Sequence, residues 1–312
     1  MKLQRRELLL LATLAAAAAT PALGQAVPPA AAPVNSSAQS VASIPDFSDF
    51  WVHPYFPGIE PPASGPGPVL NTSRRQNGVG NSSRFVGDYT NPILKPAAAE
   101  AVKRHGDISL SGVTYPTPSN RCWPSGVPYI FFQPGIRMLQ EPNRIVFLYM
   151  RDHEVRYVRM NESHPAHVTP SWYGDSVGHY EGETLVIDTV GVRTDRPFAM
   201  VDMYGAPYSP ALHVVERYRL IDYDEAQAAL ARNVKENIRT TDTHSDLAYK
   251  GKRLQLVFTV EDEGFFTMPW SATVTYEHPT QEWLEIVCSE NVFDFYAGKN
   301  DAVVPTATKP DF

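Results

Sequence analysis

The chain has 312 residues and a formal net charge of −7, and it contains 28 prolines, 19 glycines and 15 tyrosines. The acidic balance argues against nucleic acid and anionic membrane surfaces as partners and suits a neutral or cationic small molecule better. The abundance of proline, glycine and tyrosine is typical of a loop-rich β protein.

An export signal is predicted at residues 1–24. The Arg5-Arg6 pair precedes the apolar stretch Leu8–Ala19, and small residues follow it. About 12 apolar residues are too few to cross a bilayer core of roughly 30 Å as a helix, so we expect a cleaved signal peptide and no stable membrane anchor. The paired arginines fit the twin-arginine export route, although ordinary secretion signals carry such pairs as well. We therefore expect a periplasmic protein.

Residues 25–44 are rich in alanine, proline, serine and glutamine and carry no charge, which predicts a disordered linker. A single β-rich domain is expected over residues 45–312. Its first part, residues 54–91, is dense in proline, glycine, serine and asparagine and predicts a long irregular segment. A short helix is expected at Pro96–Arg104, with proline in its first turn and Gly106 beyond its end.

From Tyr129 onward, the residue pattern predicts mainly β-strands. Two strand-like runs, Arg144–Arg151 and Glu154–Met160, flank Asp152-His153, a spacing that predicts a two-residue hairpin turn. Further strands are expected at 177–180, 184–189, 213–221, 253–261, 271–277 and 283–288. Asp224–Ile238 has the apolar spacing of an amphipathic helix. This order predicts a mainly β fold, either an antiparallel meander sheet or a lipocalin-like barrel, with one or two short helices.

The two cysteines, Cys122 and Cys288, lie far apart in the sequence. In an oxidising compartment a disulfide is the simplest interpretation. The closed loop would contain about 165 residues, for which the chain-entropy estimate is on the order of 5 kcal/mol. A reactive thiol is the alternative, and it requires an activating base beside it.

Three histidines occur within sixteen residues, at His164, His167 and His179. They could ligate a metal, but His164 and His167 flank Pro165 in a predicted loop, so no helix fixes their spacing. Surface or structural histidines are the simpler interpretation, and we expect no metal site. A buried His164 or His213 near Asp202 would also suit general acid–base chemistry, because the ordinary pKa of imidazole lies near neutrality.

Residues Gly174–Gly178 match the G-x-S-x-G pattern of serine hydrolases. That motif requires a strand, a tight turn and a helix, whereas the residues that follow here predict a hairpin. A nucleophilic Ser176, with His213 as base and Asp202 or Asp188 as the orienting acid, is one hypothesis. The other is a glycine-bracketed turn whose serine caps its own backbone.

The strand at 213–219 has one face that is unusually polar for a core strand. Alternation places His213, Val215, Arg217 and Arg219 on one face and Glu216 and Tyr218 on the other. In a barrel wide enough for a ligand, Arg217 would face inward together with Arg156 and Tyr157 and supply an anion-binding group and a proton donor. The alternative is an exposed face with cross-strand salt bridges.

Aromatic side chains such as Trp172 and Trp270 could line an apolar pocket, although core packing is the default for each. The sequence contains no dinucleotide fingerprint, phosphate loop, haem-attachment motif or calcium loop. We therefore expect a protein without a cofactor.

Seven separated segments together resemble a large family of exported Gram-negative bacterial proteins. They are Arg121–Pro128, His164-Pro165, Ser171–Gly178, Glu181–Thr189, Val215–Tyr218, Met268–Trp270 and Cys288–Asn291. The resemblance runs from about Asp46 to Asn291 and supplies no activity. The β region is also similar to lipocalin-like barrels, which include ligand carriers and cofactor-free hydratases and cyclases, an analogy at the level of the fold.

The resemblance implies that the disulfide joins the Cys-Trp-Pro segment to the Cys-Ser-Glu-Asn segment. The positions it carries over are His164, Ser176, Glu216, Arg217 and Glu290. The chain departs from the family's pattern at two places. Relatives commonly have a histidine where Asp175 stands and often an acid where Met150 stands, which puts a shared proton-transfer role for these positions in doubt.

These observations predict a periplasmic, cofactor-independent lyase or isomerase, catalysing hydration, dehydration or cyclisation of a small apolar or aromatic molecule by general acid–base catalysis. His164 or His213 would move the proton and Asp202 would orient the imidazole. The expected substrate-binding residues are Arg156, Tyr157, Trp172, Glu216, Arg217 and Trp270. A carrier of the same ligand class and a serine hydrolase that uses Ser176 are the alternatives.

Overall fold

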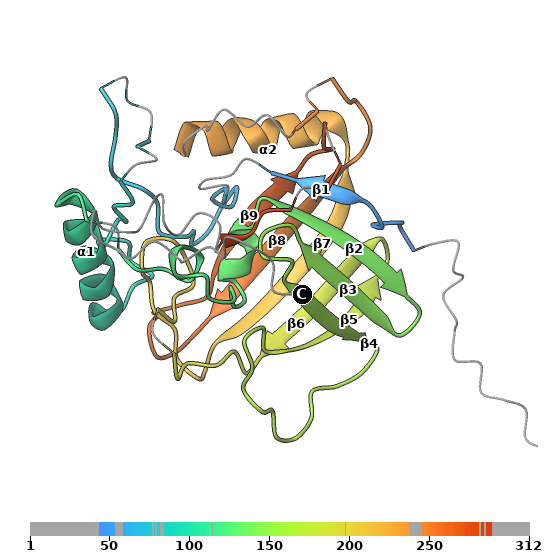
Figure 1. Cartoon of the computed structure of the whole chain (residues 1–312), viewed down its shortest axis with the longest axis horizontal. Helices are drawn as coiled ribbons and strands as arrows, with labels where there is room; N and C mark the ends of the chain where they lie inside the picture. The colour runs from blue at the N-terminus through green and yellow to red at the C-terminus, as the bar shows by residue number, and fades with distance from the viewer. Residues whose placement is uncertain are drawn as a thin grey trace, which may run out of the picture. The chain divides into compact units, whose positions relative to one another are not determined.

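Nine strands form one sheet whose order in space is their order in the sequence (Figure 1). The computed structural model describes residues 44–53, 59–76, 78, 80–81, 84–113, 115–196, 198–236, 245–246, 248–280, 282–283 and 285–288. The strands are β1 (Phe50–Val52), β2 (Gly135–Glu141), β3 (Arg144–Tyr149), β4 (Val155–Met160), β5 (Asp175–Glu181), β6 (Thr184–Val190), β7 (His213–Ile221), β8 (Arg253–Glu261) and β9 (Trp270–Tyr276). The mainly β prediction is confirmed. The expected export signal, most of the expected linker and Glu290 lie outside the described residues.

The sheet curls until its first and last strands approach each other. Val52, at the end of β1, exchanges two backbone hydrogen bonds with Glu277, just after β9, with N···O distances of 3.0 and 2.6 Å. The result is a nearly closed barrel, in which few strand edges remain open to pairing with other chains.

Neighbouring strands are antiparallel with one exception. β4 and β5 are parallel and pair over only two positions, Arg159 with Val177 and Met160 with Gly178. The segment 161–174 makes this possible, because it returns the chain to the end of the sheet at which β4 began. This crossover also carries His164.

The hairpin predicted between β3 and β4 is confirmed, but its loop has four residues and not two. Leu148 pairs with Val155, which leaves residues 150–153 in the loop once Tyr149 lies opposite Glu154. Asp152 and His153, which the sequence predicts as a two-residue turn, lie within this longer loop, and both have positive φ angles, 56° and 49°. Tyr149 donates its backbone N–H to the carbonyl of Glu154 across the turn, at 2.9 Å.

The barrel interior is filled by side chains. The ring of Phe147 packs against Tyr218 with centroids 5.4 Å apart, and Phe258 contacts both Phe131 and Trp270. Phe131 belongs to the short 3-10 helix η3 (Tyr129–Phe132), whose four residues are all buried. The packed core leaves the rim and outer face of the barrel as the places for a ligand.

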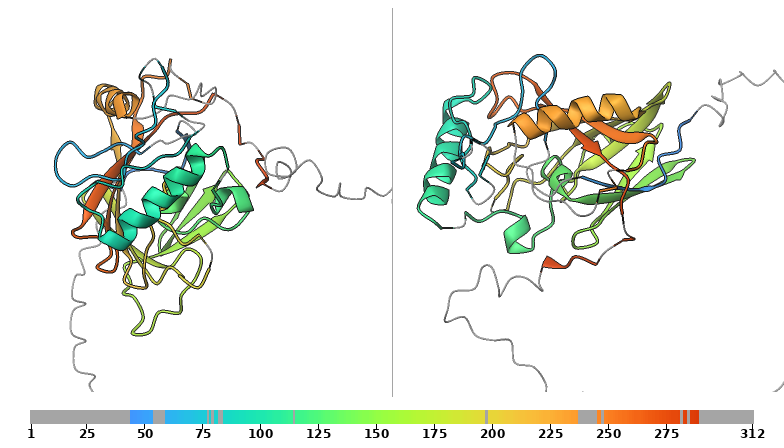
Figure 2. Two further views of the ribbon diagram at one scale, coloured as in Figure 1. Left: turned by 90° about the vertical axis from the view of Figure 1, so that its left-hand side faces the viewer. Right: turned by 90° about the horizontal axis from the view of Figure 1, so that it is seen from above.

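Two helices flank the barrel, α1 (Pro96–Leu110) beyond one end of it and α2 (Tyr223–Glu236) along the outside of β8 and β9 (Figure 2). Helix α1 continues past its predicted end at Arg104 and past Gly106 as well. Gly106 is buried within the helix, where a β-carbon would lie 3.1 Å from the side chain of Val86, so this glycine permits close packing of the irregular segment. The described part of the chain contains no helix long and apolar enough to span a bilayer.

The predicted disulfide between Cys122 and Cys288 is present. It fixes residues 285–288 beside the β3–β4 turn, where Asp152 donates its backbone N–H to the carbonyl of Ile286 at 2.7 Å and accepts from the N–H of Cys288 at 2.6 Å. The prediction of a strand at 283–288 is wrong for the residues of that segment that the structure describes. Ile286 forms a single bridge with Arg151 in place of a strand.

Candidate functional site

Five side chains form a continuous hydrogen-bonded chain on the outer face of the barrel. Four of them come from neighbouring strands, Asp175 from β5, Asp188 from β6, His213 from β7 and Glu261 from the end of β8, and the fifth is His164 of the crossover segment. Strand alternation explains the arrangement, because Ser176, Thr189 and Val214, each adjacent to one of these residues, are buried inside the barrel. We call these five residues the histidine–carboxylate chain.

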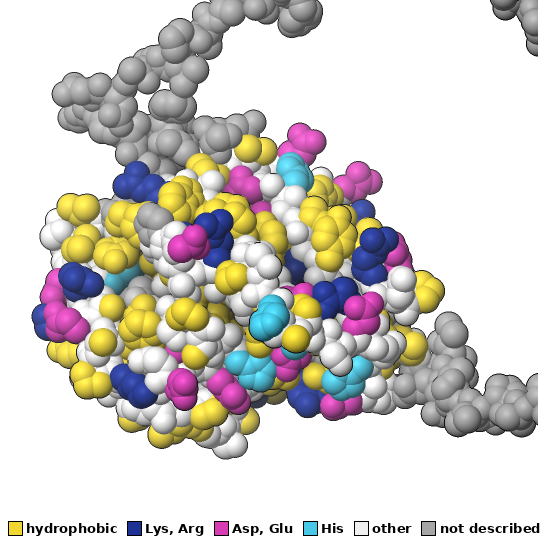
Figure 3. All heavy atoms as spheres, turned by 90° about the horizontal axis from the view of Figure 1, so that it is seen from below, with side chains coloured by type: hydrophobic (Ala, Val, Ile, Leu, Met, Phe, Trp, Pro, Cys, Tyr) yellow, Lys and Arg dark blue, Asp and Glu magenta, His cyan; other side chains and the backbone are white. Residues whose placement is uncertain are grey.

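Asp188 lies at the centre of the histidine–carboxylate chain and bridges its two imidazoles. Its Oδ1 is 2.9 Å from Nε2 of His164, and its Oδ2 is 2.8 Å from Nε2 of His213. The outer nitrogens meet carboxylates as well, with His164 Nδ1 2.6 Å from Asp175 and His213 Nδ1 3.4 Å from Glu261. Figure 3 shows histidine and acidic side chains side by side on the face of the molecule seen from below.

The carboxylates favour the protonated form of His213. The hydrogen bond to Asp188 raises the pKa of His213 above its ordinary value, and the charges of Asp188 and Glu261 act in the same direction. Partial burial alone would raise the pKa of Asp188, but the hydrogen bonds from His213 and His164 outweigh it and lower that pKa. The His213 side chain is 32 % exposed, so a proton on this ring is within reach of a bound molecule.

A hollow of about 400 Å³ opens beside His213. Its lining residues are Ala211, His213, Glu261, Asp262, Glu263, Phe266, Thr267, Met268 and Pro269. Most of them belong to the loop between β8 and β9. Asp262 shapes this loop by accepting hydrogen bonds from the backbone and hydroxyl of Ser209 and from the N–H of Gly264. The volume falls within the range of small-molecule sites in proteins.

A second polar cluster lies inside the barrel and is fully buried. Arg156 makes a two-pronged ion pair with Glu216, at 2.9 and 2.6 Å, and also donates to the hydroxyls of Ser176 and Thr189. The hydroxyl of Tyr218 donates to Glu216 at 3.0 Å. Although burial lowers the pKa of Arg156, the ion pair with Glu216 more than compensates and raises it. These groups satisfy one another, as buried charges require.

Ser176 therefore lies apart from both histidines. Its side chain is 4 % exposed, and its hydrogen-bond partners among the described residues are Arg156 and Thr189. Because the serine points inward and His213 points outward, the structure does not assemble the triad that the G-x-S-x-G hypothesis requires.

The prediction that Arg217 faces the interior of the barrel is wrong. Arg217 points outward and pairs with Glu181 at 2.6 Å, and both side chains are about half exposed. Tyr157 is 59 % exposed, because consecutive residues of a strand face opposite sides and its neighbour Arg156 points inward. The opposite face of β7, which carries Glu216 and Tyr218, faces the barrel interior. The exposed face with cross-strand salt bridges is the alternative that the structure supports.

Trp172 and Trp270, expected in one substrate site, lie in different surroundings. Trp172 is half-buried, with the guanidinium carbons of Arg193 and Arg196 each 4.9 Å from its ring centroid. Trp270 is buried in the core against Phe266. Neither tryptophan lines the hollow beside His213.

The acid that contacts His164 and His213 is Asp188 and not Asp202. Asp202 is buried and accepts hydrogen bonds from the backbone N–H groups of Tyr204 and Ala206, at 2.8 and 3.1 Å. Burial raises the pKa of this carboxyl to about 7. Asp202 thus stabilises its own loop. Glu261 was missed altogether, because its place opposite His213 depends on the register between β7 and β8.

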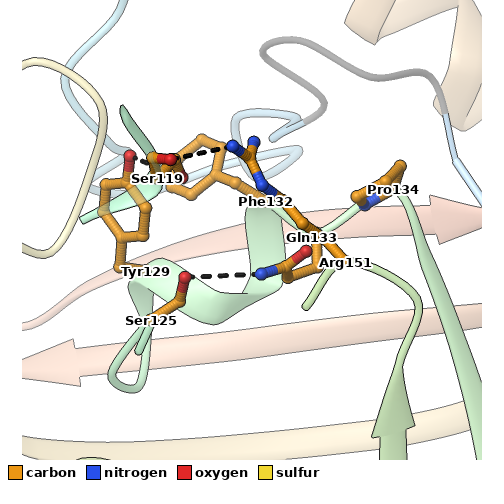
Figure 4. Close-up of a pocket in the computed structure, with 7 residues that line it drawn as sticks. All are labelled: Ser119, Ser125, Tyr129, Phe132, Gln133, Pro134 and Arg151. Atoms are coloured by element: carbon orange, nitrogen blue, oxygen red, sulfur yellow. Dashed lines mark hydrogen bonds between the residues drawn. The ribbon is translucent and has the colours of Figure 1, made fainter. Parts of the chain in front are cut away.

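A third polar group surrounds a cavity of about 10 Å³ between the 3-10 helix η3 and Arg151 (Figure 4). Ser125 and Gln133 line it, and both donate to the buried carboxyl of Glu154, Ser125 through its backbone at 2.7 Å and Gln133 through its amide at 3.1 Å. Burial raises the pKa of Glu154 to about 8. The cavity suits one water molecule and excludes an organic substrate.

In the described ranges of the chain, no group of three histidine, cysteine or acidic side chains is placed to hold a metal ion. Within the histidine–carboxylate chain, both ring nitrogens of His164 and of His213 face carboxylates. Comparison of the chain with protein-family models, curated proteins and solved structures finds no match. The family resemblance of the sequence stays a prediction.

Proposed function

We propose that this protein is a proton-transfer enzyme, a lyase or isomerase that needs no cofactor, and that it acts on a small molecule bound in the hollow beside His213. One observation carries the proposal. His213 belongs both to the histidine–carboxylate chain and to the wall of a hollow large enough for a ligand. A titratable side chain with a perturbed pKa in a pocket is a candidate for acid–base chemistry.

His213 acts as the general acid. Its Nε2–H is held by Asp188, and its Nδ1 faces Glu261 in the wall of the hollow. The raised pKa of His213 keeps the imidazole protonated further up the pH scale, so that a proton is available for a substrate oxygen. Positioned acids of this kind contribute typically about 10²–10⁴ in rate.

Glu261 acts as the general base. In a dehydration, Glu261 takes a proton from carbon, the neighbouring carbon–oxygen bond breaks, and the oxygen leaves as water with the proton of His213. In an isomerisation, the same carboxylate takes a proton from one carbon, and the substrate receives a proton from His213 at another atom. Because Nδ1 of His213 and Oε2 of Glu261 are 3.4 Å apart, the proton can return from one to the other and restore the starting state.

Asp188, His164 and Asp175 hold the acid in place. Asp188 fixes the orientation of the His213 ring, and His164 fixes Asp188 from the other side through its 2.9 Å hydrogen bond. Asp175 in turn holds His164 at 2.6 Å. These three are positioning residues, comparable in role to the acid that orients the histidine of a catalytic triad.

The test is solvent deuterium incorporation. The protein is incubated in D2O with a small-molecule extract of Gram-negative cells, and mass spectrometry records molecules that gain deuterium on carbon or change by the mass of water. The wild type is compared with His213→Gln, Glu261→Gln and a matched control, His179→Gln. His179 is also an exposed histidine 3.2 Å from a carboxylate, Glu181, and it does not line the hollow.

We expect the wild type and His179→Gln to convert the same molecules, and His213→Gln and Glu261→Gln to convert them at least about 100-fold more slowly. A molecule recovered bound but unaltered would instead identify a carrier. Undiminished conversion by His213→Gln would also contradict the proposal.

A further inference from the structure

We propose that the hollow beside His213 selects organic ammonium ions, molecules that join a positively charged nitrogen to an apolar body of about the size of one aromatic ring. The inference rests on the proposed function for the chemistry that follows binding. Its evidence is the distribution of charged and apolar side chains around the hollow.

Three carboxylates line the hollow, and they differ in how far their charge is already engaged. Asp262 already accepts three hydrogen bonds, two from Ser209 and one from Gly264 of its own loop, and Glu261 faces His213 at 3.4 Å. Glu263 is exposed, and its carboxylate has no hydrogen bond or ion pair with another described residue. Glu263 is therefore the carboxylate available to a bound cation.

The positive groups nearby bond to partners other than the Glu263 carboxylate. His213 is countered by Asp188 and Glu261, which hold its proton. Lys95 approaches the rim, but its ammonium group donates to the backbone carbonyl of Glu263 and not to the carboxylate. A carboxylate or phosphate ligand would meet the negative charges of the wall, whereas an ammonium group would find an unpaired partner.

The remaining lining side chains are apolar. Phe266 is buried and packs edge-on against Trp270, with ring centroids 5.7 Å apart. Met268 is 44 % exposed, although methionine is a large apolar side chain. A flexible thioether at the surface adapts to ligands of different shape and makes favourable contacts with aromatic rings. With Pro269 these side chains give a ligand an apolar surface beside Glu263.

The test uses three probes that share one skeleton and differ in charge, namely phenethylammonium, 2-phenylethanol and phenylacetate. Binding at pH 7 is followed by the NMR signals of ¹³C-methyl-labelled methionine, in which Met268→Leu identifies the signal at the hollow. Titrations are run in 50 and 500 mM NaCl on the wild type, on Glu263→Gln and on a matched control, Glu183→Gln. Glu183 is exposed in the turn between β5 and β6 and does not line the hollow.

We expect phenethylammonium to shift the Met268 signal and to bind more tightly than the alcohol, and phenylacetate to bind most weakly. Glu263→Gln weakens ammonium binding about two- to fivefold and leaves binding of the alcohol unchanged. High salt reduces the preference for the cation, and Glu183→Gln does not change it.

Three results would overturn the inference: equal binding of the ammonium and the alcohol, tightest binding of the carboxylate, and no shift of the Met268 signal with any probe. The proposed function fails separately. If ammonium selectivity is present while His213→Gln leaves deuterium incorporation unchanged, the proton-transfer role is wrong and the selectivity stands. If incorporation depends on His213 but the probes bind without regard to charge, only the selectivity is wrong.

Discussion

Replacing the buried Glu154 by glutamine should remove a large part of the pH dependence of stability. The carboxyl is 8 % exposed and accepts hydrogen bonds from the backbone of Ser125 and the amide of Gln133. Burial raises its pKa from 4.5 to about 8. Glutamine is tolerated because Gln133 Oε1 is buried without a partner and can accept from a new amide once the Gln133 side chain is flipped.

The number of protons bound in the native and unfolded states decides whether stability rises or falls with pH. Between pH 4.5 and 8 the native Glu154 keeps a proton that the unfolded chain has lost, so the free energy of unfolding falls as the pH rises. From pH 6 to pH 8 the loss is about 1.4 kcal/mol per pH unit, or about 3 kcal/mol, and it levels off above pH 8. Glu154→Gln removes this contribution because glutamine does not titrate.

The assay is urea unfolding at pH 6 and pH 9, with the disulfide intact. Glu154→Gln should lose about 3 kcal/mol less than the wild type between these two pH values, while the exposed Glu183→Gln control should lose as much as the wild type. Glu60 and Asp202, whose pKa values burial raises to about 7, keep their own contributions in both proteins. Equal losses in the wild type and Glu154→Gln would refute the reasoning.

Three further changes test the fold. Glu216→Gln leaves the charge of Arg156 buried without its partner, so urea unfolding should show a loss of about 3–5 kcal/mol, and a loss under 1 kcal/mol would contradict the assigned pairing. The double variant Cys122→Ser/Cys288→Ser removes a cross-link between residues 166 apart. Its free energy of unfolding should fall by up to about 5 kcal/mol, which lowers the urea midpoint, and an unchanged midpoint would count against the cross-link. Arg217→Ala removes an exposed pair, and thermal unfolding should register a change of less than about 1 kcal/mol.

Local signals in the sequence were sufficient for much of the fold. Asp152-His153 between two strand-like runs predicted a hairpin, and the structure contains that hairpin with a four-residue loop in place of the expected two-residue turn. The end of α1 was predicted too early, because Gly106 also suits a helix end. Its actual role depends on Val86, a contact between segments that no local pattern reveals.

The candidate site shows the same division between local and long-range information. Alternation correctly separated His213 and Arg217 from Glu216, but it does not say which face of a strand lies inside. The polar face with Glu216 is buried because Arg156, on another strand, supplies the compensating charge. The pairing of His213 with Asp188 likewise depends on strand register, which is set by the whole barrel.

The central claim is that Asp188 and Glu261 hold a proton on His213 at the wall of the hollow. An NMR pH titration of the imidazole Cε1–H signals tests it directly, with His213→Gln identifying the resonance. We expect His213 to titrate above 6.5 in the wild type and at a lower pH in Asp188→Asn, in which the carboxylate is lost. A His213 midpoint at or below 6.5 that does not respond to Asp188→Asn would contradict the account.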